Sequence, residues 1–303
     1  MNYAISIDIG GTNTRVSLIS DTYEIVSYES FATNPIDPLV TMDQIGDVIS
    51  RFDQDAIGIG VSCPGPADLK RGVILTPPNL PGWHGFKLVE TMEEKFGLKT
   101  YLENDANLAG LAEATLGAGK GFDYVQYLTV STGLGGGFIV NGEIYQGSKG
   151  FALEVANVIV KPGGFKLNDL KPGSVESLSS GTGIVARAKE EGIVVQHAGE
   201  VNDLANAGNE VCQKIMDEAK DGLSNLIAML YGVLDPEVIV LGGSVALKTD
   251  GFVADIETLV KEKVYEVVSP NVRLKKASLG DDNGVLGGAI LAFNRNEVEH
   301  GNS

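Results

Sequence analysis

Two glycine-rich segments of the chain carry residue types that can hold a phosphate. The first follows an apolar run and contains Asp8, Gly10, Gly11 and Thr12. Glycines let backbone N–H groups come close to an anion, and the threonine adds a hydroxyl donor. A carboxylate would repel a bare phosphate but suits one that carries Mg²⁺. A tight hairpin turn with positive φ would account for two glycines alone, whereas the flanking Asp8 and Thr12 favour a phosphate-binding turn.

The second segment, 131–137, repeats this order about half a chain later. A strand pattern is followed by Thr132, Gly133 and further glycines, and then by another strand pattern. Two such hairpins indicate a duplicated fold that closes on one phosphate chain from both sides. Neither segment matches the P-loop or the dinucleotide-binding motif, so the sequence argues against both kinds of site.

Three polar residues, 103–105, stand between a predicted strand and an alanine-rich predicted helix. Asn104 or Asp105 in this position ordinarily caps the helix. A carboxylate at the carboxyl end of a strand also lies where α/β proteins place their chemistry. The two uses are compatible, because one residue can cap the helix while the other faces a cleft. We expect the helix N-terminus to keep Asp105 ionised, as a proton acceptor requires.

Three other segments hold candidate site residues. Glu154 lies in an apolar stretch, 150–159, where burying a carboxylate is costly unless it bonds to something. Glu176 lies near the start of a predicted helix, where a favourable dipole contact alone explains it. Gly242 and Gly243 follow a buried strand and would let a flat ring approach the backbone.

The hydrophobic pattern predicts the elements that must position these residues. The predicted strands include a hairpin over 4–19 and the segments 56–62, 99–102, 123–130 and 237–241. The predicted helices include 106–116, 211–231 and 284–294. Alternation of strands with helices indicates an α/β protein.

Composition bounds the class of protein. The chain has 303 residues, of which 43% are hydrophobic and 39 are glycine, as in an α/β protein of two domains with many tight turns. No apolar run approaches the roughly 20 residues of a membrane span, and no signal-peptide pattern precedes the first strand, so we expect a cytoplasmic protein. A net charge of −17 argues against binding to nucleic acid or an anionic membrane. The two cysteines and three histidines are scattered, so their spacing assembles no zinc site.

Four motifs in order resemble those of the ROK (repressor, ORF, kinase) family: Asp8–Arg15, Glu103–Asn107, Thr132–Gly137 and Val240–Gly243. The segment 78–83 is similar to a loop of the glucokinase-like members, and the resemblance covers nearly the whole chain. It implies an α/β fold of the actin-like (hexokinase-like) ATPase class, with two α/β domains around a central cleft. The expected domains are 1–115 plus 284–303, with the last helix returning to the first domain, and 116–283.

The resemblance also implies a function. We expect an ATP- and Mg²⁺-dependent kinase, a homodimer, that phosphorylates the 6-hydroxyl of a hexose or N-acylhexosamine such as glucose or N-acetylmannosamine. One alternative is a β-glucoside kinase acting on a disaccharide or glycoside. Another is a non-catalytic sugar-sensing regulator: the family's repressors begin with a helix-turn-helix domain, whereas the first strand here begins at Ala4. A further alternative is an inactive sugar-binding module, against which Asp105 argues because such a module needs no proton acceptor.

Site residues follow from the resemblance position by position. Asp105 is similar to the family's general base, and Asn104 to the partner of a sugar hydroxyl. The residues expected to bind the sugar are Gly65, Asn79, Asn104, Glu154, Asn157 and Glu176. The residues expected to bind ATP are Asp8, Gly10, Gly11, Thr12, Asn13, Thr132, Gly133, Gly242 and Gly243.

The chain departs from the family pattern at two places. The family's Gly-Glu-Ile-Gly-His run is here 153–157, so that Asn157 replaces the histidine. The family's zinc-binding cysteine motif is missing, because 161–176 contains no cysteine. We therefore expect no structural zinc, and a relaxed or redirected selectivity on the C1–C2 side of the sugar, which the histidine usually supports.

Overall fold

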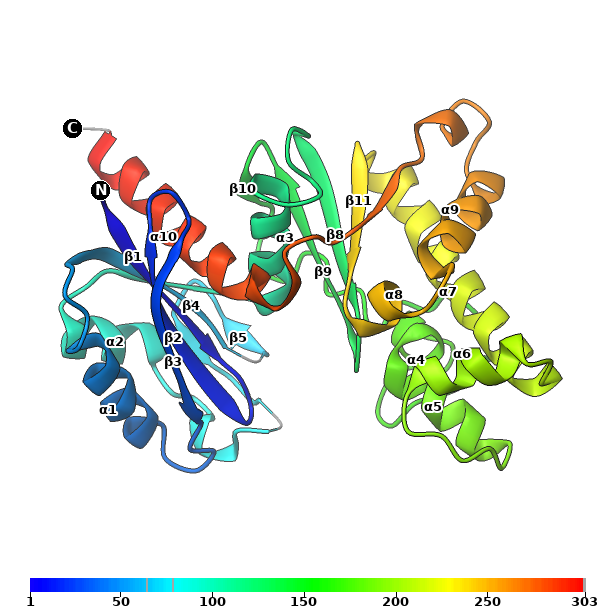
Figure 1. Cartoon of the computed structure of the whole chain (residues 1–303), viewed down its shortest axis with the longest axis horizontal. Helices are drawn as coiled ribbons and strands as arrows, with labels where there is room; N and C mark the ends of the chain where they lie inside the picture. Colours follow the sequence, from blue (N-terminus) through cyan, green and yellow to red (C-terminus); the bar gives the residue numbers. More distant parts are fainter. Residues whose placement is uncertain (64, 78, 302–303) are drawn as a thin grey trace. The chain divides into compact units, whose positions relative to one another are not determined.

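The computed structural model describes residues 1–63, 65–77 and 79–301 (Figure 1). The chain divides into two compact units. Unit 1 comprises Met1–Ala112, Gln146–Ala152 and Leu279–Ser303, and unit 2 comprises Glu113–Tyr145 and Leu153–Ser278. The domain boundaries expected from the sequence, after residues 115 and 283, lie a few residues from the points where the chain passes between the units. The expected domains did not include the return of Gln146–Ala152 to unit 1.

Unit 1 contains a mixed five-stranded sheet in the order β3-β2-β1-β4-β7. These strands are β1 (Tyr3–Ile9), β2 (Asn13–Ser20), β3 (Ile25–Ala32), β4 (Ala56–Ser62) and β7 (Thr100–Glu103). β1, β2 and β3 pair antiparallel, whereas β1, β4 and β7 run parallel. The hairpin over 4–19 and the strand over 56–62 are therefore confirmed.

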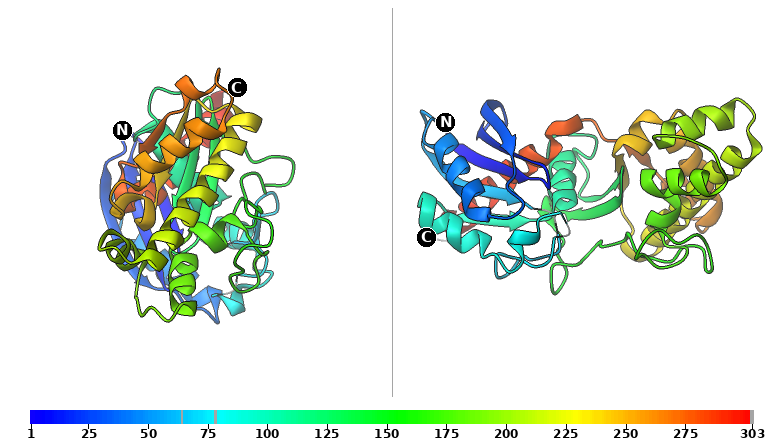
Figure 2. Two further views of the ribbon diagram at one scale, coloured as in Figure 1. Left: turned by 90° about the vertical axis from the view of Figure 1, so that its right-hand side faces the viewer. Right: turned by 90° about the horizontal axis from the view of Figure 1, so that it is seen from below.

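The last helix of the chain packs on the sheet of unit 1. The elements that lie wholly in this unit besides its sheet are α1 (Pro38–Ile49), β5 (Ala67–Asp68), β6 (Val73–Ile74), η1 (Pro81–Trp83), α2 (Leu88–Phe96), η3 (Gly280–Asp282) and α10 (Asn283–Gly301). α10 contacts β1 and β4 (Figures 1 and 2). A second core lies on the other side, where Trp83 is fully buried and donates its Nε1–H to Asn34 O at 2.8 Å.

Unit 2 repeats this topology with the order β10-β9-β8-β11-β12. The strands are β8 (Tyr124–Val130), β9 (Leu134–Val140), β10 (Glu143–Ile144), β11 (Val238–Gly242) and β12 (Leu274–Lys276). Again an antiparallel set continues into parallel strands, which confirms the predicted duplication. The predicted turn over 131–137 is shorter than expected, because β9 begins at Leu134. Its last three glycines, 135–137, pair with β8, and a Cβ on Gly136 would lie 3.0 Å from Leu128 Cδ2.

Helices cover the sheet of unit 2. They are α4 (Val175–Ser179), α5 (Gly181–Glu190), α6 (Ala198–Asn206), α7 (Glu210–Leu234), α8 (Ser244–Lys248) and α9 (Phe252–Lys263), with the short η2 (Ser269–Asn271). The helix predicted over 211–231 is confirmed as part of α7, which buries the apolar residues of its core-facing side from Ile215 to Tyr231, whereas Val211 is 39% exposed. The remaining helix, α3 (Asp105–Thr115), begins in unit 1 and ends in unit 2. Within the described part of the chain, every helix is too short or too polar to cross a bilayer.

We predict that Gly287→Ala destabilises the protein. A Cβ on Gly287 of α10 would overlap the carbonyl of Leu108, and a backbone atom cannot give way as a flexible side chain can. We expect a lower melting temperature, corresponding to about 1–3 kcal/mol of overpacking. The matched control is Gly284→Ala, in the same helix but facing open space among the described residues, which should melt like the wild type or slightly higher. Equal melting of Gly287→Ala and the wild type would contradict this packing of α10.

Candidate active site

The corner between β7 and α3 presents Asp105. Asn104 caps the helix, because its Oδ1 accepts the N–H groups of Ala106 at 2.9 Å and Asn107 at 3.3 Å. Asp105 is the first residue of α3, and its side chain is exposed to solvent. Asn104 thus caps the helix while the side chain of Asp105 is open to solvent, a division that the sequence allowed.

The pKa of Asp105 is raised above its ordinary value. Desolvation by the surrounding protein atoms is the largest cause, although solvent still reaches the side chain, and the charge of Asp8 adds to it. The N–H of Ala106, 2.8 Å from Asp105 Oδ1, lowers the pKa by less. The expectation that the helix N-terminus keeps Asp105 ionised counted only the lowering contribution. A carboxylate with a raised pKa is the stronger proton acceptor.

The glycine turn of unit 1 lies next to this corner. Asp8 accepts a hydrogen bond from Ser62 Oγ at 2.5 Å, and burial followed by the charges of Asp8 and Asp105 raises the pKa of the Cys63 thiol. Both carboxylates therefore act on the same end of β4. Pro64, the second residue after β4, lies outside the described residues.

The two glycines of this turn are needed for space. Neither Gly10 nor Gly11 has a positive φ, so the positive-φ explanation of the turn is wrong. The Gly10 N–H donates to Asn13 O at 2.8 Å, and a Cβ on Gly11 would lie 2.9 Å from Asn79 Cβ. Among the described residues, the backbone N–H groups of Gly11 and Thr12 have no acceptor, and Thr12 is exposed. These groups are available to an anion.

Two predicted residues are less closely connected to this site. Gly65 is exposed, and a Cβ on it would meet nothing within 4 Å among the described residues. Asn79 is exposed beside Gly11, whereas Pro78, the first residue of the glucokinase-like loop, lies outside the described residues. The structure therefore places Asn79 at the glycine turn but gives Gly65 no described partner there.

Glu176 supports the glycine turn of unit 2 through contacts with Leu134 and Gly133. The Glu176 Oε2 accepts the Leu134 N–H at 2.8 Å, and a Cβ on Gly133 would lie 2.9 Å from the same oxygen. Thr132 is exposed, and its carbonyl accepts the Thr182 N–H at 3.3 Å. Glu176 also lies in the first turn of α4, where a dipole contact is favourable. It thus positions the turn as well as the helix start.

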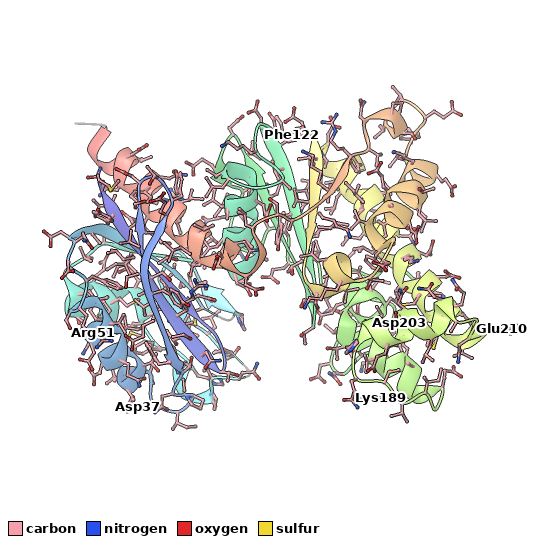
Figure 3. All side chains as sticks on the ribbon, viewed as in Figure 1. Asp37, Arg51, Phe122, Lys189, Asp203 and Glu210 are labelled. Carbon is pink, nitrogen blue, oxygen red and sulfur yellow. The ribbon has the colours of Figure 1, made fainter. Side chains whose placement is uncertain are left out.

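A pocket of about 760 Å³ opens beside this turn, entirely within unit 2. Its lining combines Thr132 with Asn202 and Asp203 of α6 and Lys248 of α8 (Asp203 is labelled in Figure 3). A cavity of this size suits a drug-sized ligand such as a nucleoside. The sequence did not point to the residues of α6 and α8, because single polar residues on short helices form no motif.

Gly242 and Gly243 do not line this pocket. A Cβ on Gly242 would overlap Tyr127 Oη, and one on Gly243, whose φ is 85°, would overlap Val130 O. The glycines are required for the close packing of β11 against β8. Their effect on the pocket is indirect, since the chain continues from them into Ser244, which does line it.

Glu154 and Asn157 are both exposed. The expectation of a carboxylate embedded among apolar groups is wrong for Glu154, because the apolar neighbours do not enclose it; Ile159, for example, is 51% exposed. Glu154 stands at the tip of a tight turn in which the Val155 N–H donates to Leu153 O at 2.7 Å. Asn157 Oδ1 accepts the Lys171 N–H at 2.7 Å.

That hydrogen bond anchors the loop where the ROK resemblance would place zinc. Further bonds join Leu167 N–H to Ser177 Oγ at 3.1 Å and Gly173 N–H to Phe165 O at 2.8 Å. Across the described residues, no group of three or more His, Cys, Asp or Glu side chains is placed to hold a metal ion. A single carboxylate such as Asp8 would be enough for a phosphate-bound magnesium ion, which takes only one or two protein carboxylates.

Comparisons with known proteins identify relatives over nearly the whole chain. The model of the ROK family matches residues 4–295. The chain is 32% identical to a glucokinase of Halalkalibacterium halodurans, over 98% of this chain and 97% of the other. It is 32% identical to an N-acetylmannosamine kinase of Escherichia coli, over 95% and 97%.

Solved structures show the same fold. The ROK hexokinase of Thermus thermophilus superposes with a TM-score of 0.87 at 29% identity, covering 97% of this chain and 98% of the other. The ROK glucokinase of Streptomyces griseus, solved with glucose and AMPPNP, gives 0.75 at 27% identity, covering 97% and 100%. The expected actin-like α/β fold is confirmed. The chain therefore belongs to the ROK family, as one of its ATP-dependent sugar kinases.

Proposed function

We propose that this kinase transfers the γ-phosphoryl group of ATP to the 6-hydroxyl of a hexose or N-acylhexosamine such as glucose or N-acetylmannosamine. Asp105 carries the proposal. It is exposed at a capped helix start, and desolvation and Asp8 raise its pKa. The homologues named glucokinase and N-acetylmannosamine kinase support both sugars equally.

In the proposed reaction, Asp105 takes the proton of the sugar hydroxyl as that oxygen attacks the γ-phosphorus. The bond from the γ-phosphorus to the bridging oxygen breaks, and the electron pair leaves on ADP. In unit 1, the amides of Gly11 and Thr12 are available to stabilise phosphate oxygens. Mg²⁺, held with the phosphates by Asp8, would neutralise part of the developing charge.

In unit 2, the proposal assigns the pocket beside Thr132 to the nucleoside of ATP. Thr132 and Gly133 then face its phosphates. Glu176 holds this turn and is one of the sugar-binding residues carried over from the family. The remaining sugar-binding residues of the proposal are Gly65, Asn79, Asn104, Glu154 and Asn157.

Asp105→Asn should lower kcat by roughly 10²–10⁴ while sugar binding persists, because asparagine keeps the size of the side chain but cannot accept the proton. Its melting temperature should equal or exceed that of the wild type. The folded-state pKa of Asp105 is raised, so ionising this group costs the folded state stability as pH rises past the unfolded value. A kcat above about a tenth of the wild-type value would show that Asp105 is not the general base and acts only at the start of the helix.

A pH profile provides the second test of Asp105. The wild-type kcat/KM should fall on the acid side at a pH above about 3.9, the ordinary aspartate pKa, because protonated Asp105 accepts no proton. The residual activity of Asp105→Asn should lack this acid limb. An acid limb that persists unchanged in the variant would assign it to another group.

We expect the fold to need no zinc. The segment 161–176 contains no cysteine, and the bonds of Asn157 and Ser177 hold the loop. Elemental analysis of protein purified without a metal-binding tag should find far less than one zinc per chain. Stoichiometric zinc that survives a chelator would overturn this expectation.

The sugar preference should be relaxed on the C1–C2 side. Asn157 is shorter than the family's histidine, and its Oδ1 is already occupied by the Lys171 N–H. One lost hydrogen bond weakens recognition there by about 1 kcal/mol. We would measure kcat/KM for glucose, N-acetylmannosamine, N-acetylglucosamine and the β-glucoside cellobiose, and expect glucose to lead its best competitor by less than about a hundredfold, or 2.7 kcal/mol.

Asn157→His is the matched control for this experiment. If Asn157 relaxes the sugar preference, this variant should increase the ratio of kcat/KM for the best sugar to kcat/KM for the other sugars. A wild-type lead for glucose of a hundredfold or more over every other sugar would contradict the prediction. If cellobiose leads, the β-glucoside kinase alternative replaces the hexose kinase.

A further inference from the structure

Glu103 is a buried carboxylate that the proposed reaction does not use. It ends β7 and is only 1% exposed. Three neutral amides donate to it: the Asn104 N–H at 2.9 Å and the Asn107 Nδ2 at 2.8 Å on Oε1, and the Gln146 Nε2 at 2.5 Å on Oε2. Because a buried carboxylate without donors is costly, these three bonds hold it in one orientation.

The first oxygen of Glu103 holds the residues on both sides of Asp105. Asn104 immediately precedes Asp105 and caps α3, and Asn107 lies half a turn further along the helix. Asn107 is 3% exposed, so its amide is fixed among protein atoms. The backbone that aims Asp105 is therefore tied to the Oε1 of Glu103.

The second oxygen holds the start of Gln146–Ala152, a segment that we call the strap. The strap belongs to unit 1, although the residues on either side of it, Tyr145 and Leu153, belong to unit 2. Lys70 Nζ donates to Ser148 O at 2.7 Å and provides a second anchor. The chain leaves the strap through Leu153 directly into Glu154.

We propose that Glu103 is a positioning residue: through Oε1 it orients Asp105, and through Oε2 it anchors the strap that leads to Glu154. The inference rests on the proposed roles of Asp105 and Glu154. It predicts two separable effects. Disturbing the Oε1 side lowers kcat, whereas disturbing the Oε2 side raises the KM for the sugar and leaves the KM for ATP unchanged.

The test exchanges the two polar groups. Gln146→Glu replaces the donor of the 2.5 Å bond with a second carboxylate, and we expect the sugar KM to rise about tenfold or more. The double variant Glu103→Gln with Gln146→Glu restores a donor and an acceptor in reversed order. Its residue 103 keeps one oxygen for Asn104 and Asn107, so the sugar KM should return to within about threefold of the wild type.

Glu94→Gln is the matched control for Glu103→Gln, because it makes the same Glu-to-Gln change at an exposed position of α2. It should behave like the wild type. Gln146→Ala is the second variant, to be used if Gln146→Glu does not fold. It removes the donor without adding charge and should also raise the sugar KM selectively.

Three results would overturn the proposal. One is a wild-type sugar KM in Gln146→Glu or, where that does not fold, in Gln146→Ala. Another is a double variant no better than the worse single variant. The third is loss of activity in proportion to loss of folded protein with both KM values unchanged, which indicates a purely structural role. A wild type that phosphorylates no sugar would instead refute the proposed function, so the two failures are distinguishable.

Discussion

Close approach of backbone segments is the constraint on which both the core and the site depend. A Cβ on Gly60 would overlap the Gly288 carbonyl where α10 crosses the sheet of unit 1. A Cβ on Gly243 would overlap the Val130 carbonyl at the corresponding sheet of unit 2. The glycine turns follow the same rule, since Gly11 and Gly133 pack against Asn79 and Glu176. Lack of a side chain thus brings elements together and leaves backbone donors open to an anion.

Electrostatic competition decides the character of Asp105. A capped helix start favours a carboxylate, but desolvation and the nearby charge of Asp8 outweigh that effect and raise its pKa. Such an arrangement costs folding stability and improves a proton acceptor, a trade that functional sites commonly make. Glu103 shows the opposite solution two residues earlier, where three amide donors satisfy a carboxylate that is only 1% exposed.

The two sheets explain why one chain repeats a motif. Each has an antiparallel set of strands that continues into parallel strands, and each places a glycine turn after its first strand. Topology is shared, but the surroundings are not. The turn of unit 1 lies beside Asp105, whereas the turn of unit 2 opens on a pocket built from α6 and α8. The duplicated topology therefore has different surroundings in the two units, and the ROK family model covers both.

The sequence by itself determined the features that depend on neighbouring residues: the strand over 56–62, the apolar face of α7, and a helix cap at Asn104 or Asp105. Hydrophobic periodicity and helix capping involve residues close together in the sequence, so they can be recognised without knowledge of the fold. Tertiary structure alone decided the exposure of Glu154, the raised pKa of Asp105 and the bond from Gln146 to Glu103, 43 positions apart. Burial, desolvation and pairing depend on which distant segments come together, and no local pattern encodes that.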